Sequence, residues 1–148
     1  RVLWKYPGLD YSLVKPTGLL AKQTYLDDRK TEIQKTVQAF AKTHGLWFFF
    51  RGNCSYCHHF APILKQFAEH YGFQVLAVSL DGGALPDFPE ARLNFGQAEK
   101  LNVASVPALF SVNPKTQEIQ PVSYGLMTIQ ELEERIWTIS QNGLGEAL

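Results

Sequence analysis

The chain has 148 residues, of which 45% are hydrophobic and 19% charged, and its formal net charge is zero. This composition supports a buried core and excludes an intrinsically disordered chain. The charge balance argues against a nucleic-acid partner, and the longest strongly apolar run, residues 46–50, is too short for a membrane span, which needs about 20 residues.

Residues 1–24 are expected to form an irregular N-terminal arm, because prolines and glycines interrupt any regular pattern there. The arm is rich in apolar side chains such as Trp4 and Tyr11, so we expect it to pack on the domain or on a segment outside this chain. The chain opens with Arg1, without Met and without the apolar stretch of a signal peptide. We therefore expect it to be an internal piece of a longer precursor.

The remaining sequence alternates between apolar residues at helical spacing and short continuous apolar runs, which are typical of buried strands. In chain order we expect a helix over 26–42, a strand over 46–50, a helix that ends at 71, a strand over 74–80, a loop over 81–90, a short helix over 96–101, strands over 108–112 and 118–123, and a helix over 128–139. The last helix opens with a Thr128–Glu131 capping box.

This order predicts an α/β fold. Two strands that flank a helix pair in parallel, and the two later strands form an antiparallel hairpin with Pro121 at an edge of the sheet. The result is a mixed sheet with helices on both faces. We expect the domain to occupy residues 25–141, with a frayed end over 142–148.

The chain has only two cysteines, Cys54 and Cys57, so no disulfide framework holds it together. Their C-x-x-C spacing follows a buried strand and opens a helix, where unpaired N–H groups and the helix dipole stabilise a thiolate. Cys54 is therefore the expected exposed nucleophile and Cys57 the shielded resolving thiol. Ser55 and Tyr56 lie between them and are expected to tune the redox chemistry.

Three other interpretations of the cysteine pair are open. Cys54–His58 reads as a C-x-x-C-H haem-attachment string with Met127 as a second ligand, but such a site requires neither the preceding strand nor the proline that follows at Pro62. A closed zinc site needs four ligands, and a second cysteine or histidine pair at ligand spacing is missing. Unreactive core cysteines do not favour the polar residues around this pair. We therefore favour redox use, with no metal and no cofactor.

At this point the motifs resemble those of the thioredoxin superfamily over residues 46–139. Cys54-Ser-Tyr-Cys57 with Pro62 is similar to the family's active-site helix, Ser105–Leu109 to its cis-proline loop, and Gly125 to the glycine before its last helix. The resemblance implies a thioredoxin-like fold and a cis Val106–Pro107 bond. It also implies that Val106 and Pro107 bind an extended segment of the substrate.

A narrower resemblance extends into the N-terminal arm. The matching segments look like the TraF family of F-type conjugative transfer and type IV secretion; they are residues 9–13 with Pro16, 50–52, 78–82, 95–98 and 123–125. This resemblance implies a periplasmic protein with other conjugative-transfer proteins as partners. The F-plasmid branch of the family lacks the cysteine pair, which this chain keeps. TrbB, a thiol isomerase of the same systems, is the family most easily confused with it.

The chain departs from thioredoxin at the position six residues before the first cysteine. Thioredoxin has a buried acid there that serves the resolving thiol, whereas this chain has Phe48. We therefore expect no carboxylate near the thiols and a disulfide that is more oxidising than that of thioredoxin. Asp81, which follows a strand, is expected to be only a turn residue, in a loop longer than that of thioredoxin.

Two functional classes follow from the sequence. The first is a periplasmic thiol:disulfide oxidoreductase or isomerase that uses Cys54 and Cys57 on protein substrates with cysteines or disulfides in conjugative pilus assembly. The second is a non-catalytic docking module of the secretion system, in which the cysteines are dispensable.

Overall fold

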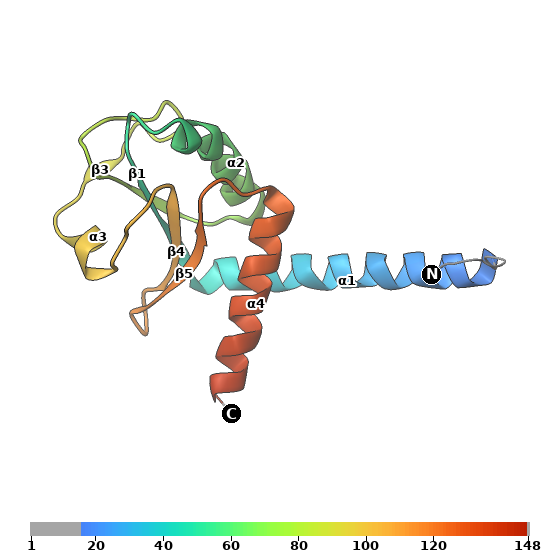
Figure 1. The fold of residues 1–148 in the computed structure, drawn as a ribbon. Helices are drawn as coiled ribbons and strands as arrows, with labels where there is room; N and C mark the ends of the chain where they lie inside the picture. Colours follow the sequence, from blue (N-terminus) through green and yellow to red (C-terminus); the bar gives the residue numbers. More distant parts are fainter. Residues whose placement is uncertain (1–15, 148) are drawn as a thin grey trace. The chain divides into compact units, whose positions relative to one another are not determined.

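The computed structural model describes the backbone of residues 16–147 and the side chains of residues 25–141. Residues 1–15 of the expected arm lie outside this range. The chain divides into two compact units, residues 1–35 and 36–148, and each is described by itself. The helices and strands (Figure 1) are α1 (Pro16–Thr43), β1 (Gly45–Phe50), α2 (Ser55–Tyr71), β2 (Val75–Ser79), β3 (Arg92–Leu93), α3 (Gln97–Lys100), β4 (Ala108–Asn113), β5 (Glu118–Tyr124) and α4 (Ile129–Ala147).

Three elements differ from the expectation. α1 begins at Pro16, within the stretch expected to be irregular, because proline is tolerated in the first turn of a helix and residues 19–23 are strong helix formers. The two-residue strand β3 was not expected, since it is too short to show any alternation. The backbone of α4 continues to Ala147, through residues expected to fray. None of the helices in residues 16–147 combines the length and the apolar character that a membrane crossing requires.

The second unit contains a five-stranded mixed sheet in the order β3-β2-β1-β4-β5 (Figure 1). β1 pairs in parallel with β2 and antiparallel with β4, and β4 and β5 form the predicted hairpin. β5, which contains Pro121, is an edge strand as predicted, while the short β3 forms the other edge. The fold class predicted from the sequence is confirmed.

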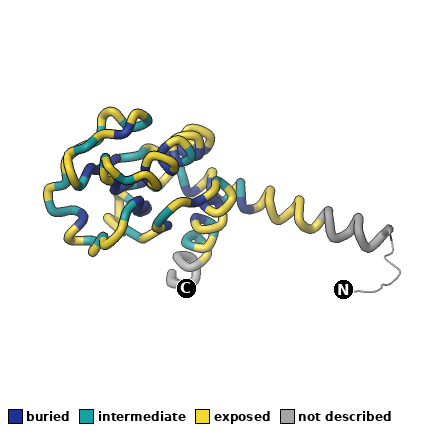
Figure 2. Tube along the Cα trace, turned by 45° about the horizontal axis from the view of Figure 1, so that its top comes forward, coloured by how far each residue is buried: buried dark blue, intermediate teal, exposed yellow. Residues whose placement is uncertain are grey.

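The central strand β1 is buried on both faces. Phe48 contacts Phe60 of α2 with an edge-to-face ring geometry, so the even-numbered side chains face α2. Phe49 points to the opposite face, where it packs with Phe110 of β4 and with Ala98 of α3. Figure 2 shows the buried stretches of the chain gathered toward the inside of the folded part, with exposed stretches around them. The aromatic run of β1 therefore forms the centre of the core.

The helix α2 packs on this core through side chains at helical spacing. Its buried residues are Cys57, Phe60, Ala61, Leu64, Phe67, Ala68 and Tyr71. The helix ends at Gly72, whose left-handed backbone (φ 84°) lets its N–H bond to Ala68 O. Tyr71 donates a hydrogen bond to the buried carboxylate of Glu133 in α4, and Thr128 and Glu131 form the predicted capping box at the start of α4. The position of the first turn of α2 is thus set by the packing of the whole helix.

We expect Phe48→Ala to destabilise the protein by about 3–5 kcal/mol, because it leaves a cavity beneath α2 at a fully buried side chain. Phe95→Ala is the matched control, since the Phe95 side chain is 84% exposed. It should change the free energy of unfolding by less than about 0.5 kcal/mol. Urea denaturation of the two variants measures both values, and equal losses would contradict this account of the core.

Candidate active site

Cys54 is the N-cap residue of α2 and lies just beyond the end of β1. Its backbone is extended (φ −95°, ψ 115°), and its Sγ accepts a hydrogen bond from the Cys57 N–H at 3.1 Å. The first N–H groups of a helix have no intrahelical partner and carry partial positive charge, so a thiolate at this place is stabilised. The geometry therefore supplies the stabilising environment that the sequence predicted for the first cysteine.

The two cysteines differ in exposure. Cys54 is half-buried, Cys57 is completely buried, and both are free thiols. Burial, together with the hydrogen bond to Cys54, raises the pKa of Cys57 to about 12. The negative charge of Asp81 is a smaller cause of the same rise. The predicted difference in exposure is confirmed, and the predicted roles of nucleophile and resolving thiol are consistent with it.

The segment before β4 lies against the first cysteine. The Val106–Pro107 bond is cis, as predicted, and the Cys54 Sγ lies 3.9 Å from the Val106 carbonyl oxygen. Pro107 is buried and Val106 is half-buried. The Pro107 carbonyl accepts a hydrogen bond from the N–H of Gly125 at 2.8 Å, so the loop after β5 joins the same site. The segment before β4 thus lies beside Cys54, and the loop after β5 is bonded to that segment.

Exposed side chains surround the cysteine pair on the side of α2 and on the loop after β5. Ser55 and Tyr56 are both exposed, with 62% of Tyr56 accessible. Tyr124 and Leu126 are exposed on either side of Gly125. The tuning role of Ser55 and Tyr56 stays a prediction. Both positions are nevertheless accessible to another protein that approaches Cys54.

Asp81, which the sequence predicted to be only a turn residue, connects two loops near the cysteines. Its carboxylate accepts the N–H of Gly52 at 3.0 and 3.2 Å and the N–H of Gly83 at 2.9 Å. These bonds hold the pKa of Asp81 below its usual range, so the group is ionised at neutral pH. The parallel register places Phe50 opposite Ser79, and two residues further along each strand Gly52 meets Asp81. The strand register brings this contact about, and no local sequence pattern contains it.

The expectation that no carboxylate lies near the thiols is therefore wrong. As expected, Phe48 occupies the core position beneath α2 at which thioredoxin has a buried acid. The charge that acts on Cys57 comes instead from Asp81 at the end of β2, a different element. Because Asp81 is fully exposed, solvent and salt screen its effect on the thiols.

The haem and zinc interpretations each require a set of ligands that lie close together in the structure. Within those residues no group of three or more His, Cys, Asp and Glu side chains is arranged to hold a metal ion. His58 and His59 are both exposed, but they differ in their contacts: the His58 ring reaches back to the Gly52 carbonyl at 2.7 Å. Met127 is buried.

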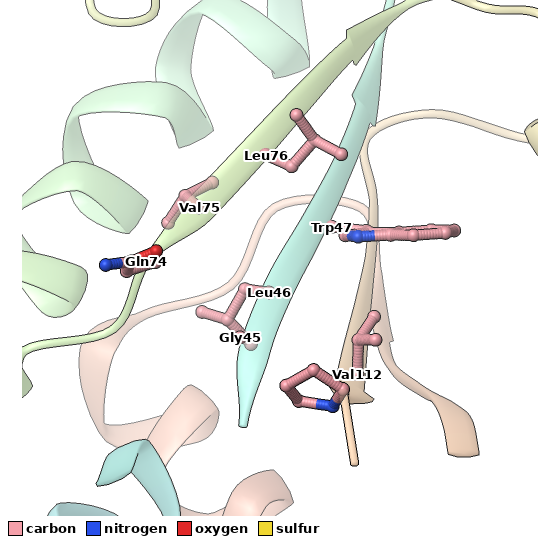
Figure 3. A pocket seen from close by; sticks show the side chains of 8 residues that line it. Gly45, Leu46, Trp47, Gln74, Val75, Leu76 and Val112 are labelled. Atoms are coloured by element: carbon pink, nitrogen blue, oxygen red, sulfur yellow. The ribbon is translucent and has the colours of Figure 1, made fainter. Parts of the chain in front are cut away.

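A groove of about 300 Å³ lies at the opposite end of β1 from the cysteines. It is lined mainly by Leu46, Trp47, Leu76 and Val112, and Figure 3 shows Leu46 and Trp47 on opposite sides of β1. Every lining residue is described, and none is titratable or nucleophilic. The chemically competent site is therefore the cysteine pair and not this groove.

The mixed sheet, the helix that begins at the C-x-x-C pair and the cis-proline loop together define a thioredoxin-like fold with a dithiol site. Solved structures with this fold are similar. A protein assigned as thiol:disulfide interchange protein DsbE from Chlorobium tepidum superposes with a TM-score of 0.54 at 20% identity, over 69% of this chain and 83% of that chain. The exposed lipoprotein thioredoxin Etrx1 of Streptococcus pneumoniae strain TIGR4 gives 0.52 at 17% identity, over 69% and 89%.

A profile of the TraF family, the F plasmid transfer operon protein, matches residues 1–137, and the chain belongs to this family. Protein TraF of Escherichia coli strain K12 is 29% identical over 144 residues, which are 96% of this chain and 58% of TraF. Protein TrbB of the same strain is 37% identical over 97 residues, which are 63% of this chain and 54% of TrbB. The chain thus spans little more than half the length of these curated relatives.

At pH 7 we expect iodoacetamide to modify Cys54 far faster than Cys57. A pKa of about 12 leaves Cys57 with a thiolate fraction roughly three thousandfold below that of an ordinary cysteine, whose pKa is about 8.5. The reactivity of Cys57 in the folded protein should rise only as the pH approaches about 12, and in urea it should rise near pH 8.5. Mass spectrometry of the wild type and of Cys54→Ser measures both rates. Equal rates in the folded wild type would contradict the assignment.

Proposed function

We propose that this chain is a thiol:disulfide oxidoreductase or isomerase in which Cys54 and Cys57 form the redox pair. The observation that carries the proposal is the pairing of a half-buried Cys54, whose Sγ accepts an N–H at the start of α2, with a buried thiol one turn further on. Thiol–disulfide exchange needs both: an accessible thiolate that attacks, and a protected thiol that resolves.

In the reductive direction the Cys54 thiolate attacks one sulfur of a substrate disulfide. A bond forms between Cys54 Sγ and that sulfur, the substrate disulfide breaks, and the second substrate sulfur leaves as a thiolate that takes a proton from water. Cys57 then loses its proton to solvent and attacks Cys54 Sγ. The Cys54–Cys57 disulfide forms, and the first substrate sulfur leaves as a thiolate that takes a proton from water. Two electrons have passed from the Cys54–Cys57 dithiol to the substrate, and oxidation of a substrate dithiol follows the reverse path.

The backbone around Val106 supports binding of an extended substrate segment beside the reacting sulfur. The Val106 carbonyl oxygen lies 3.9 Å from Cys54 Sγ, and Val106 is half-buried, two residues before the start of β4. A strand-like peptide can form backbone hydrogen bonds there, as in other strand additions at exposed edges. Pro107, which has no N–H to offer to a substrate, is buried next to this binding position.

We place the activity in the periplasm, on proteins of the conjugative pilus and the type IV secretion apparatus. Membership of a family described as the F plasmid transfer operon protein supports this choice of system and makes other transfer proteins the partners we propose. The choice of compartment is supported by chemistry, because disulfides form and persist in the bacterial periplasm and are kept reduced in the cytosol.

Cys57→Ser should trap substrates as mixed disulfides, because the resolving thiol is gone while Cys54 can still attack. Cys54→Ser should abolish turnover altogether. Both variants are tested with a peptide that contains one disulfide, and the trapped complex is detected as a covalent adduct on a non-reducing gel. An adduct formed by Cys54→Ser as fast as by Cys57→Ser would contradict the assigned roles, and a faster one would reverse them.

The docking-module alternative is separated by complementation. A strain that lacks the native gene receives either the wild type or the Cys54→Ser/Cys57→Ser double variant, each in the full-length precursor, and plasmid transfer is counted. Redox function predicts that transfer falls with the double variant at normal protein levels. Full transfer with the double variant would leave the docking module as the function of this chain.

We expect a redox potential of about −230 to −130 mV, which is more oxidising than the about −270 mV of thioredoxin. The direct N–H contact at 3.1 Å stabilises the Cys54 thiolate and therefore the reduced form. The opposing charge of Asp81 is screened because that side chain is fully exposed. Equilibration with glutathione buffers gives the value. A potential at or below that of thioredoxin would favour a reductase.

A further inference from the structure

The backbone of Gly52 is held at both of its polar groups. Its N–H donates to the two carboxylate oxygens of Asp81 at 3.0 and 3.2 Å. Its carbonyl oxygen lies 2.7 Å from Nε2 of His58. Because a carbonyl oxygen can only accept a hydrogen bond, Nε2 of His58 carries the proton in this contact. One group comes from the loop after β2 and the other from the first turn of α2.

The Asp81 carboxylate is itself fixed in place. It accepts the N–H of Gly83 at 2.9 Å and the hydroxyl of Ser79 at 3.3 Å. The two loops also touch, because a Cβ added at Gly52 would lie 2.6 Å from the Cα of Gly83. The carboxylate therefore reaches Gly52 from a well-defined position.

Gly52 belongs to the turn that leads into the first cysteine. The Cys54 N–H donates to the Arg51 carbonyl at 3.3 Å, and the Cys54 carbonyl accepts the first helical hydrogen bond, from the His58 N–H at 3.2 Å. Displacement of Gly52 therefore moves the backbone that carries Cys54. The 3.1 Å contact between Cys54 Sγ and the Cys57 N–H depends on that backbone.

We propose that Asp81 and His58 are positioning residues of the redox site, which hold Gly52 so that the Cys54 sulfur stays on the N–H of Cys57. This inference depends on the proposed redox function. Neither side chain needs to touch the substrate. Their effect reaches the reaction through the place of the attacking sulfur.

Two substitutions of Asp81 separate position from charge. Asp81→Asn and Asp81→Ala both remove the negative charge, but the asparagine keeps an Oδ1 that can accept the N–H groups of Gly52 and Gly83. At pH 7 we expect iodoacetamide to modify Cys54 about fivefold more slowly in Asp81→Ala than in Asp81→Asn, the ratio for one net hydrogen bond. The redox potential of Asp81→Ala in glutathione buffers should be about 20 mV lower than that of Asp81→Asn. This value is the fivefold ratio converted at about 29.6 mV per tenfold change in the equilibrium constant. Glu90→Gln removes an exposed charge from the same loop and should match the wild type.

A second pair of variants tests the contact of the Gly52 carbonyl oxygen with His58. His58→Ala removes the donor to Gly52, and His59→Ala removes a neighbouring histidine that is also exposed. We expect His58→Ala to slow alkylation of Cys54 by a few-fold and His59→Ala to leave it unchanged. If Asp81→Ala does not show the cooperative urea unfolding of the wild type, the histidine pair decides.

The two proposals fail in different ways. If the wild-type cysteines form no reversible disulfide in glutathione buffers, the redox function fails. If they do, but Asp81→Ala matches Asp81→Asn and His58→Ala matches His59→Ala, the positioning roles are overturned while the redox function stands.

Discussion

The parallel pairing of β1 with β2 is the constraint on which the cysteine site depends. Parallel strands end at the same edge of a sheet, and the register that sets Phe50 against Ser79 makes the two chains leave that edge side by side. The turn before Cys54 therefore meets Asp81 without any long connection. The antiparallel neighbour β4 starts at this edge, with Ala108 opposite Phe49, so the preceding Pro107 arrives there too. β5 ends there as well, since Tyr124 pairs with Ala108.

The aromatic core connects the elements that meet at this edge. Phe48 packs against Phe50 within β1, against Phe60 of α2 and against Phe88 of the loop that follows β2. The same ring thus supports the helix that carries the cysteines and the loop that includes Asp81. An aromatic side chain in this place makes the core continuous, whereas a buried carboxyl group would need its own hydrogen-bond partners or a raised pKa. The negative charge near the thiols lies instead at the surface, on Asp81.

The fold could be predicted from the sequence because local and global signals agree along most of the chain. The run Leu46–Phe50, the capping box at Thr128 and the edge proline Pro121 each point to one structure, and each is found. The start of α1 was missed because Pro16 reads as a breaker unless it stands in a first turn. The contact between Gly52 and Asp81 was missed for another reason. It joins residues 29 positions apart, and only the strand register, which no local pattern contains, brings them together.

The burial of Cys57 affects the lifetime of the covalent complex between Cys54 and a substrate. On the proposed chemistry, the step that ends each encounter requires Cys57 to give up a proton from a buried site, and burial raises the pKa of that thiol. Few molecules hold the attacking form at any moment, so the covalent complex with a substrate is long-lived compared with a pair whose second thiol ionises readily. While this complex lasts, another cysteine of the substrate can attack the substrate sulfur of the mixed disulfide. A new disulfide then forms within the substrate, and Cys54 is released as a thiolate. In the proposed function, such a slow release would favour rearrangement of existing disulfides within a substrate protein over their net reduction.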